Sequence, residues 1–164
     1  MQRYIFPIIM LLLAGALQGN LPHWLVIKGA RPDFLLVVLI AVSLTQDPLT
    51  GAVLGFLAGL IHGSIVGINI GSFIVSRTII GFAAGSVTIR LFSENPVVPV
   101  LAAGGLTFVG EALFLLANPA PDMLASLNIV LFKSLYNSLL TLIVYWFLRW
   151  LELRRKIKLA TARL

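Results

Sequence analysis

Residues 51–63 read GAVLGFLAGLIHG, and the glycines of this stretch recur at a fixed spacing of four. In an α-helix a step of four residues turns about 400°, so successive glycines drift by only about 40° and three or four of them share one face. The stretch therefore predicts a helix with one face almost free of side chains. The row consists of Gly51, Gly55, Gly59, Gly63, Gly67 and Gly71, with Gly81 and Gly85 further along the chain.

Such a helix is stable in a membrane rather than in water. In water each glycine costs a helix roughly 1 kcal/mol relative to alanine. In a bilayer the backbone must hydrogen-bond to itself, and a bare face lets a second helix approach closely. Two interpretations are open: the face packs against another helix of the same chain, or it receives the helix of a separate protein. The helix is expected to stop near Gly67 and Asn69, which tolerate turn conformations.

The composition places the whole chain in the membrane. Of its 164 residues 59% are hydrophobic and 11% are charged, with a mean hydropathy of +1.02, outside the range of soluble domains. The absence of cysteine excludes disulfides, zinc thiolates and iron–sulfur clusters, and two histidines make a metal site improbable. No cofactor is expected. The net charge of +6 gathers after the last apolar segment, which predicts contact with anionic lipid and argues against nucleic acid.

Six apolar segments predict one all-α transmembrane domain over residues 1–148, followed by a basic cytoplasmic tail over residues 149–164. An uncleaved first span is favoured over a signal peptide because further spans follow. The core of the second segment, residues 34–44, is short for a bilayer about 30 Å thick, so a re-entrant hairpin with the third segment remains an alternative. An even number of spans puts both termini on one side of the membrane, and the basic tail predicts that this side is cytoplasmic. The expected spans are residues 4–21, 32–45, 49–65, 70–91, 97–117 and 124–148.

Charged residues buried within a membrane span are costly and are functional candidates by default. At about 1.5 Å per residue, Arg77, Glu111 and Lys133 all lie roughly 10 Å below the outer surface and could meet. One interpretation is an Arg77–Glu111 ion pair that fixes helix register, in which case exchanging the two residues should rescue a charge reversal. The other is a functional pocket that adds His62 and Asn137 as polar groups.

No catalytic constellation accompanies these charges. The chain has no HExxH or GxSxG motif, no phosphate-binding loop and no paired carboxylates at matching depth. Asp33, Asp47 and Asp122 are expected in separate loops. An enzyme is therefore not predicted.

These residues together resemble the MreD family of bacterial rod-shape-determining membrane proteins. The resemblance rests on Arg31-Pro32-Asp33 before the second span, on Gly-Phe-Leu-Ala-Gly at residues 55–59, and on a Gly-Ile-Asn step at residues 67–69. It implies a non-catalytic six-helix bundle similar to the substrate-binding S components of energy-coupling-factor importers. It also implies the bitopic protein MreC as partner, within a machinery that holds RodA, a penicillin-binding transpeptidase and MreB. Many relatives carry an aspartate after the glycine segment, which the compact residues 62–66 lack here.

The sequence thus predicts an inner-membrane scaffold subunit of the cell-elongation machinery that binds MreC and helps regulate the wall synthase. The residues expected to contact the partner or pack helices are Arg31, Pro32, Asp33, Gly51, Gly55, Gly59 and Gly63. Those expected in an intramembrane polar cluster are Arg77, Glu111, Lys133, His62 and Asn137. The alternative, of another class, is an S component of a vitamin or metal importer, which would need a ligand pocket open to the outside.

Overall fold

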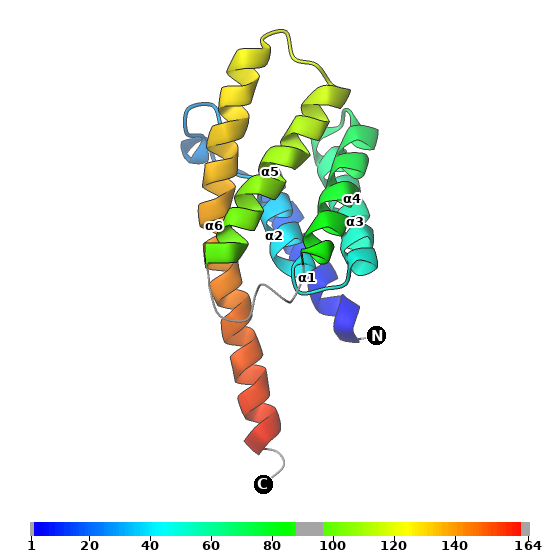
Figure 1. Cartoon of the computed structure of the whole chain (residues 1–164), viewed down its shortest axis with the longest axis vertical. Helices are drawn as coiled ribbons and strands as arrows, with labels where there is room; N and C mark the ends of the chain where they lie inside the picture. The colour runs from blue at the N-terminus through cyan, green and yellow to red at the C-terminus, as the bar shows by residue number, and fades with distance from the viewer. Residues whose placement is uncertain (1, 88–96, 162–164) are drawn as a thin grey trace.

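The structure, a computed structural model, describes residues 2–87 and 97–161. In these ranges it contains six α-helices and one short 3₁₀-helix (Figure 1). Each predicted span overlaps one of the α-helices, and the expected end of the 70–91 span lies outside the described residues. The elements are α1 (Gln2–Gly19), η1 (His23–Leu25), α2 (Phe34–Ser43), α3 (Pro48–Val66), α4 (Ile70–Ser86), α5 (Val97–Ala117) and α6 (Met123–Thr161).

Three of the helices are long and apolar enough to cross a membrane. They are α3, residues 100–117 of α5 and residues 123–148 of α6. The apolar helices α1, α2 and α4 are shorter. This composition, in an all-helical chain, is that of a helical membrane protein. Whether all six helices cross the bilayer stays a prediction.

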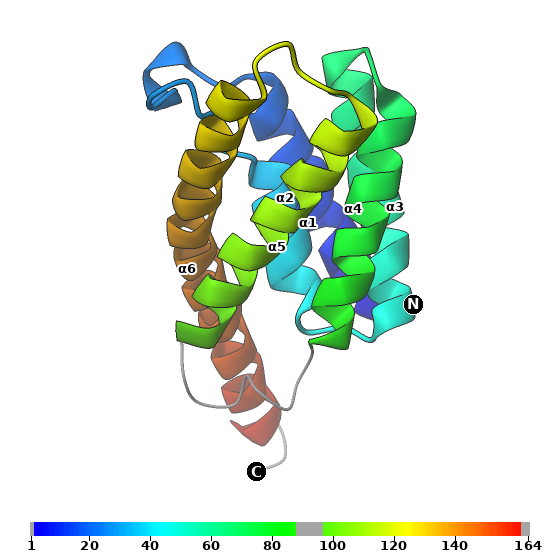
Figure 2. The same cartoon turned by 45° about the horizontal axis from the view of Figure 1, so that its top comes forward.

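The short helix α2 forms the centre of the bundle. It contacts each of the other five α-helices, and its residues from Leu35 to Ser43 are all buried. Figures 1 and 2 show it enclosed between α1, α5 and the α3–α4 pair. A helix that is apolar on every side is stable only when every side is covered. Because protein rather than lipid covers α2, its length of ten residues, about 15 Å, need not match the bilayer.

The glycine row of α3 packs against α4 of the same chain. A Cβ added to Gly55 would collide with the backbone of Arg77 and Thr78, and one on Gly59 would lie 2.6 Å from the carbonyl oxygen of Phe73. Gly51 meets Gly81 in the same way, so the two helices touch backbone to backbone. The interpretation that this face receives a partner's helix is therefore wrong. All four predicted contact glycines, Gly51, Gly55, Gly59 and Gly63, are buried under α4.

Left-handed residues end α3 and begin α4, as the sequence predicts. Gly67 is the C-cap of α3 with φ 78°, and its N–H donates to the carbonyl of Gly63. Asn69 has φ 54° and precedes the first turn of α4. The reversal brings α4 back along the glycine face of α3, because the two helices are antiparallel neighbours joined by three residues.

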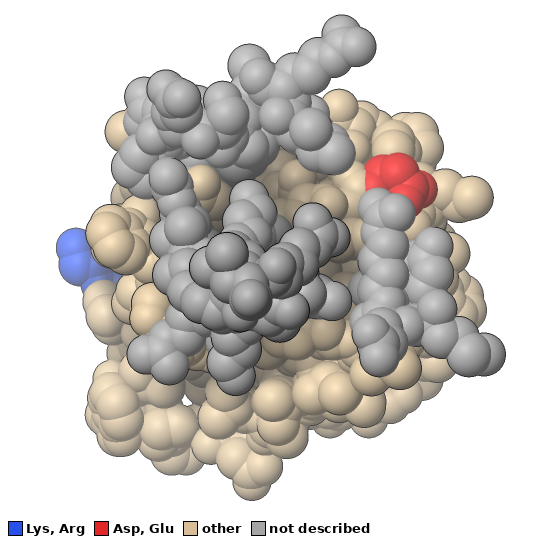
Figure 3. All heavy atoms as spheres, turned by 90° about the horizontal axis from the view of Figure 1, so that it is seen from below, with Lys and Arg blue, Asp and Glu red and all other residues tan. Residues whose placement is uncertain are grey.

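The helix α6 extends well past the rest of the bundle. It has 39 residues and continues as a helix to Thr161, through most of the predicted basic tail. The start of α1 and the end of α6 lie toward the same end of the molecule (Figure 1). Seen from that end, the described surface carries Lys, Arg, Asp or Glu only at its edges (Figure 3).

Candidate functional site

The polar centre of the bundle is built around Asp33, the residue that precedes α2. Its Oδ1 accepts a hydrogen bond from the N–H of Leu36 at 2.9 Å, so the side chain caps the helix. A carboxylate is favoured there because the N-terminus of a helix carries a partial positive charge. Since α2 starts inside the bundle, the cap is buried with 0% of Asp33 exposed. Asp33 thus lies in the connection before α2, as the sequence predicts, but the expectation that it is separated from the other carboxylates is wrong, because Asp33 and Glu111 both bind Arg77.

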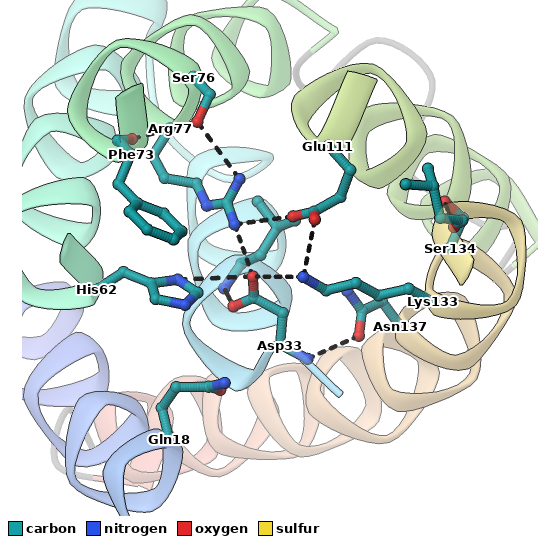
Figure 4. A network of polar contacts seen from close by, with 12 residues as sticks. Gln18, Asp33, His62, Phe73, Ser76, Arg77, Glu111, Lys133, Ser134 and Asn137 are labelled. Carbon is teal, nitrogen blue, oxygen red and sulfur yellow. Dashed lines mark hydrogen bonds and ion pairs between the residues drawn. The ribbon is translucent and has the colours of Figure 1, made fainter. Parts of the chain in front are cut away.

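Asp33 is one member of a ring of four alternating charges (Figure 4). The Nη2 of Arg77 lies 2.7 Å from Asp33 Oδ2 and 2.9 Å from Glu111 Oε1. The Nζ of Lys133 lies 2.9 Å from Glu111 Oε2 and 3.6 Å from Asp33 Oδ2, which closes the ring. The expected Arg77–Glu111 pair is thus present. We call these four residues the charge ring; Asp33 is the N-cap of α2, and the other three lie on α4, α5 and α6.

The charge ring is neutral as a whole, and this is what makes it tolerable in the membrane. Two carboxylates and two cations cancel, and each charge has an opposite charge on either side. A single buried charge would cost several kcal/mol, while a closed set of pairs recovers most of that cost. Arg77 is only 1% exposed, and Glu111 and Lys133 are slightly exposed. The ring holds four helices in one register.

His62, from α3, lies beside the ring rather than in it. The imidazole of His62 stacks on the phenyl group of Phe73, with their centroids 4.4 Å apart. The centroids of the Phe73 and Phe114 phenyl groups are 4.5 Å apart. The Nδ1 of His62 is 3.6 Å from Asp33 Oδ2, beyond hydrogen-bond reach. This aromatic stack covers the side of the ring that faces α3. Among the described residues no group of three His, Cys, Asp or Glu side chains could hold a metal ion.

Two amide side chains hydrogen-bond to the backbone at the start of α2. Asn137, on α6, accepts from the N–H of Asp33 at 3.0 Å, and Gln18, on α1, accepts from the N–H of Phe34 at 2.8 Å. The first N–H groups of a helix have no partner within it, and in an apolar core they need one. With Gln18 the polar centre draws on all six α-helices. Gln18 was not among the predicted residues, although a glutamine in an apolar span is a signal that could have identified it.

The predicted contact triplet before α2 does not act as one surface. Pro32 and Asp33 are buried, whereas Arg31 is exposed to solvent or lipid. Of the three, only Arg31 is accessible to another molecule. The predicted cluster residues Arg77, Glu111, Lys133, His62 and Asn137 do come together, and Asp33 joins them.

A comparison with known protein families gives a match over nearly the whole chain. A family model described as rod shape-determining protein MreD matches residues 1–155, which include every residue of the charge ring. The chain belongs to the MreD family. The role of this family lies in rod-shape determination, and MreD proteins are structural components rather than typical enzymes. None of the curated proteins and none of the solved structures compared with this MreD chain matches it significantly.

The ring changes the expected result of the charge exchange between Arg77 and Glu111. In the doubly exchanged protein a glutamate at 77 would face Asp33, and an arginine at 111 would face Lys133. Both new contacts join like charges at the 2.7–2.9 Å spacing of the present pairs. The exchange does restore the neutrality that Arg77→Glu alone removes, so we expect the double variant to recover only part of the lost stability and to stay well below the wild type, measured as the thermal midpoint in detergent. Recovery of the wild-type midpoint would show that Asp33 and Lys133 do not close the ring.

Proposed function

We propose that the protein is a non-enzymatic scaffold of the cell-elongation machinery in the bacterial inner membrane and that it binds the membrane helix of MreC. The observation that carries the proposal is the charge ring with its supports, which brings polar side chains from each α-helix or, for α2, from the residue that caps it, to one centre. In this network the two carboxylates and the two cations of the charge ring pair with one another. Such a centre supports a rigid bundle that presents a fixed outer surface.

The importer alternative has less support. A substrate-binding component needs polar groups that are free to meet a ligand, whereas the carboxylates and cations of the charge ring are bound to each other at 2.7–2.9 Å. The likeness to S components therefore rests on the resemblance of the sequence alone.

The outward face of α5 is the surface that best fits a partner helix. Its exposed side chains follow helical spacing, and Leu101 and Leu116 at the two ends are each 70% exposed. In the middle lies Gly105, where an added Cβ would meet nothing within 4 Å. The face, which we call the α5 face, consists of Leu101, Gly105, Phe108, Ala112 and Leu116.

Gly105 differs from the glycines of α3 because no helix in the described part of the chain packs against it. A glycine inside a helix costs roughly 1 kcal/mol relative to alanine, and the α3 glycines offset that cost by close packing on α4. Gly105 has no such compensation within the described residues. A second helix resting on the α5 face would supply it, since small residues let membrane helices approach closely.

Replacing Gly105 by leucine is expected to abolish co-purification of MreC while the protein still folds. The leucine would extend into space that the chain leaves open, and it would separate the backbone of α5 from that of the partner. The measurement is a detergent pull-down of the tagged protein from its native membrane with mass spectrometry of the recovered proteins. The wild type should recover MreC, with RodA, the penicillin-binding transpeptidase and MreB as further expected components.

Gly71→Leu is the matched control. Gly71 is also exposed with nothing within 4 Å of an added Cβ, but it belongs to α4 and not to the α5 face. This variant should recover MreC as the wild type does. Equal recovery from both variants would exclude the α5 face, and recovery of ATPases with a coupling subunit in place of MreC would overturn the scaffold function itself.

A further inference from the structure

The connection between α1 and α2 forms a tight turn that lies against α6. Ile27 and Ala30 exchange backbone hydrogen bonds of 3.0 and 2.9 Å, and the two residues between them, Lys28 and Gly29, both have positive φ, at 50° and 78°. This is the geometry of a two-residue hairpin turn with both central residues left-handed. Figures 1 and 2 show the connection beside the upper part of α6.

Contacts with α6 hold the turn in place. The Nζ of Lys28 lies 4.7 Å from the centre of the Phe132 ring, close enough for a cation–π interaction. Ile129 lies within 4 Å of the position that a Cβ on Gly29 would take. The turn therefore has a defined position on the helix.

An apolar groove of about 210 Å³ runs between this turn and α6. The lining residues that α6 contributes are three and four positions apart, so they follow one face of the helix for about 10 Å. Nearly all of its lining is apolar, which disfavours ordered water. The lining residues are Ile27, Ala30, Phe132, Leu135, Tyr136 and Leu139.

The rim of the groove is positively charged. Lys28 and Arg31 are both exposed in the connection between α1 and α2, and Lys28 sits over Phe132, a lining residue. The only acid of this connection is Asp33, which is buried in the charge ring. In the α5–α6 loop, the exposed Asp122 caps α6 by accepting from the N–H of Ala125. An anionic group at the rim would therefore meet cations without a competing exposed carboxylate from its own segment.

We propose that this groove binds one acyl chain of an anionic phospholipid, with the lipid phosphate against Lys28. The size of the groove favours an acyl chain over a protein helix as its occupant. A helix with its side chains is about 10–12 Å across, and a volume of 210 Å³ cannot enclose it. The apolar lining takes the chain and the basic rim selects the headgroup. The lipid belongs to the leaflet on the side of the α1–α2 connection. This site is separate from the α5 face and does not depend on the proposed function.

The test uses the full chain purified in detergent, with phosphatidylglycerol and phosphatidylethanolamine as probes and native mass spectrometry to count bound lipid. The wild type should bind one phosphatidylglycerol about fivefold more tightly than phosphatidylethanolamine, the preference expected when one lysine faces a headgroup of net negative charge rather than one whose phosphate is balanced by an ammonium. Lys28→Gln should remove the preference, and Lys28→Arg should keep it. Equal affinity of the wild type for the two lipids would overturn the proposed headgroup selection.

A second variant tests the groove itself. Leu139→Trp should fill it and lower the affinity for both lipids at least tenfold, while Ile143→Trp, one turn further along α6 and exposed outside the groove, should change neither. Unchanged binding in Leu139→Trp would overturn the site. If that variant fails to fold, the wild-type protein is photo-cross-linked to phosphatidylglycerol that carries a photoreactive acyl chain, and the cross-linked residues are mapped. Cross-links within residues 132–139 support the proposal, and an even spread over the exposed helices contradicts it.

Discussion

Gly55→Leu is expected to prevent the folded protein from accumulating. A Cβ at position 55 would fall on the carbonyl oxygen of Arg77 and within 2.8 Å of Thr78 Cα, and backbone atoms cannot give way as a flexible side chain can. The two helices would have to separate along their whole contact. Separation would also move Arg77 away from Asp33 and Glu111, so packing and the charge ring would fail together. We expect a loss of at least about 4 kcal/mol, at the upper end of what single substitutions cause.

The measurement is the yield of monodisperse protein in detergent together with its thermal midpoint. Gly105→Leu is the control, because the same substitution on α5 enters open space. Gly55→Leu should lose most of the folded protein, whereas Gly105→Leu should keep the wild-type yield. If Gly55→Leu folds normally and loses only MreC, the glycine row is a partner surface and the close α3–α4 packing described above is contradicted.

Asp33→Asn is expected to destabilise the protein by about 3 kcal/mol, the lower end of the range for breaking a buried ion pair. Asparagine keeps the size of the side chain and remains a good N-cap, so the hydrogen bond from Leu36 can persist. What is lost is the negative charge between Arg77 and Lys133. The ring then carries a net positive charge in an apolar core. The thermal midpoint in detergent should fall by roughly 6–12 °C.

Two further variants separate charge from capping. Lys133→Met combined with Asp33→Asn restores neutrality, since Arg77 and Glu111 remain as a pair, and should recover at least half of the lost stability. Asp47→Asn changes the exposed cap of α3, whose Oδ1 accepts from the N–H of Thr50, and should cost less than about 1 kcal/mol. If Asp33→Asn and Asp47→Asn had equal effects, the role of Asp33 would be capping alone.

The depth of the intramembrane charges could be predicted because the rise per residue of a helix is constant. Counting from the ends of their spans places Arg77, Glu111 and Lys133 at one level, and the structure joins them in one ring. The same counting could not place Asp33. The depth of Asp33 in the membrane depends on where α2 starts within the bundle. The sequence of the ten residues of α2 contains no signal that predicts this starting point.

The glycine row shows the same division between local and tertiary information. A spacing of four determines that the glycines share a face and that another backbone can approach it. It does not identify that backbone, because a helix of the same chain and a helix of a partner satisfy the same requirement. The α4 glycines Gly81 and Gly85 were the available sign of an internal match, and both pack against the first turns of α3.

The sequence by itself determined the properties that follow from local periodicity and composition: a helical membrane protein, the close-approach face of α3, its end at Gly67, the shared level of three charges and the resemblance to MreD. Only the tertiary structure decided that α2 is enclosed, that α4 covers the glycine row and that Asp33 completes a neutral ring with Arg77, Glu111 and Lys133. The physical reason is that helix formation depends on neighbours along the chain, whereas enclosure and charge balance depend on which helices meet.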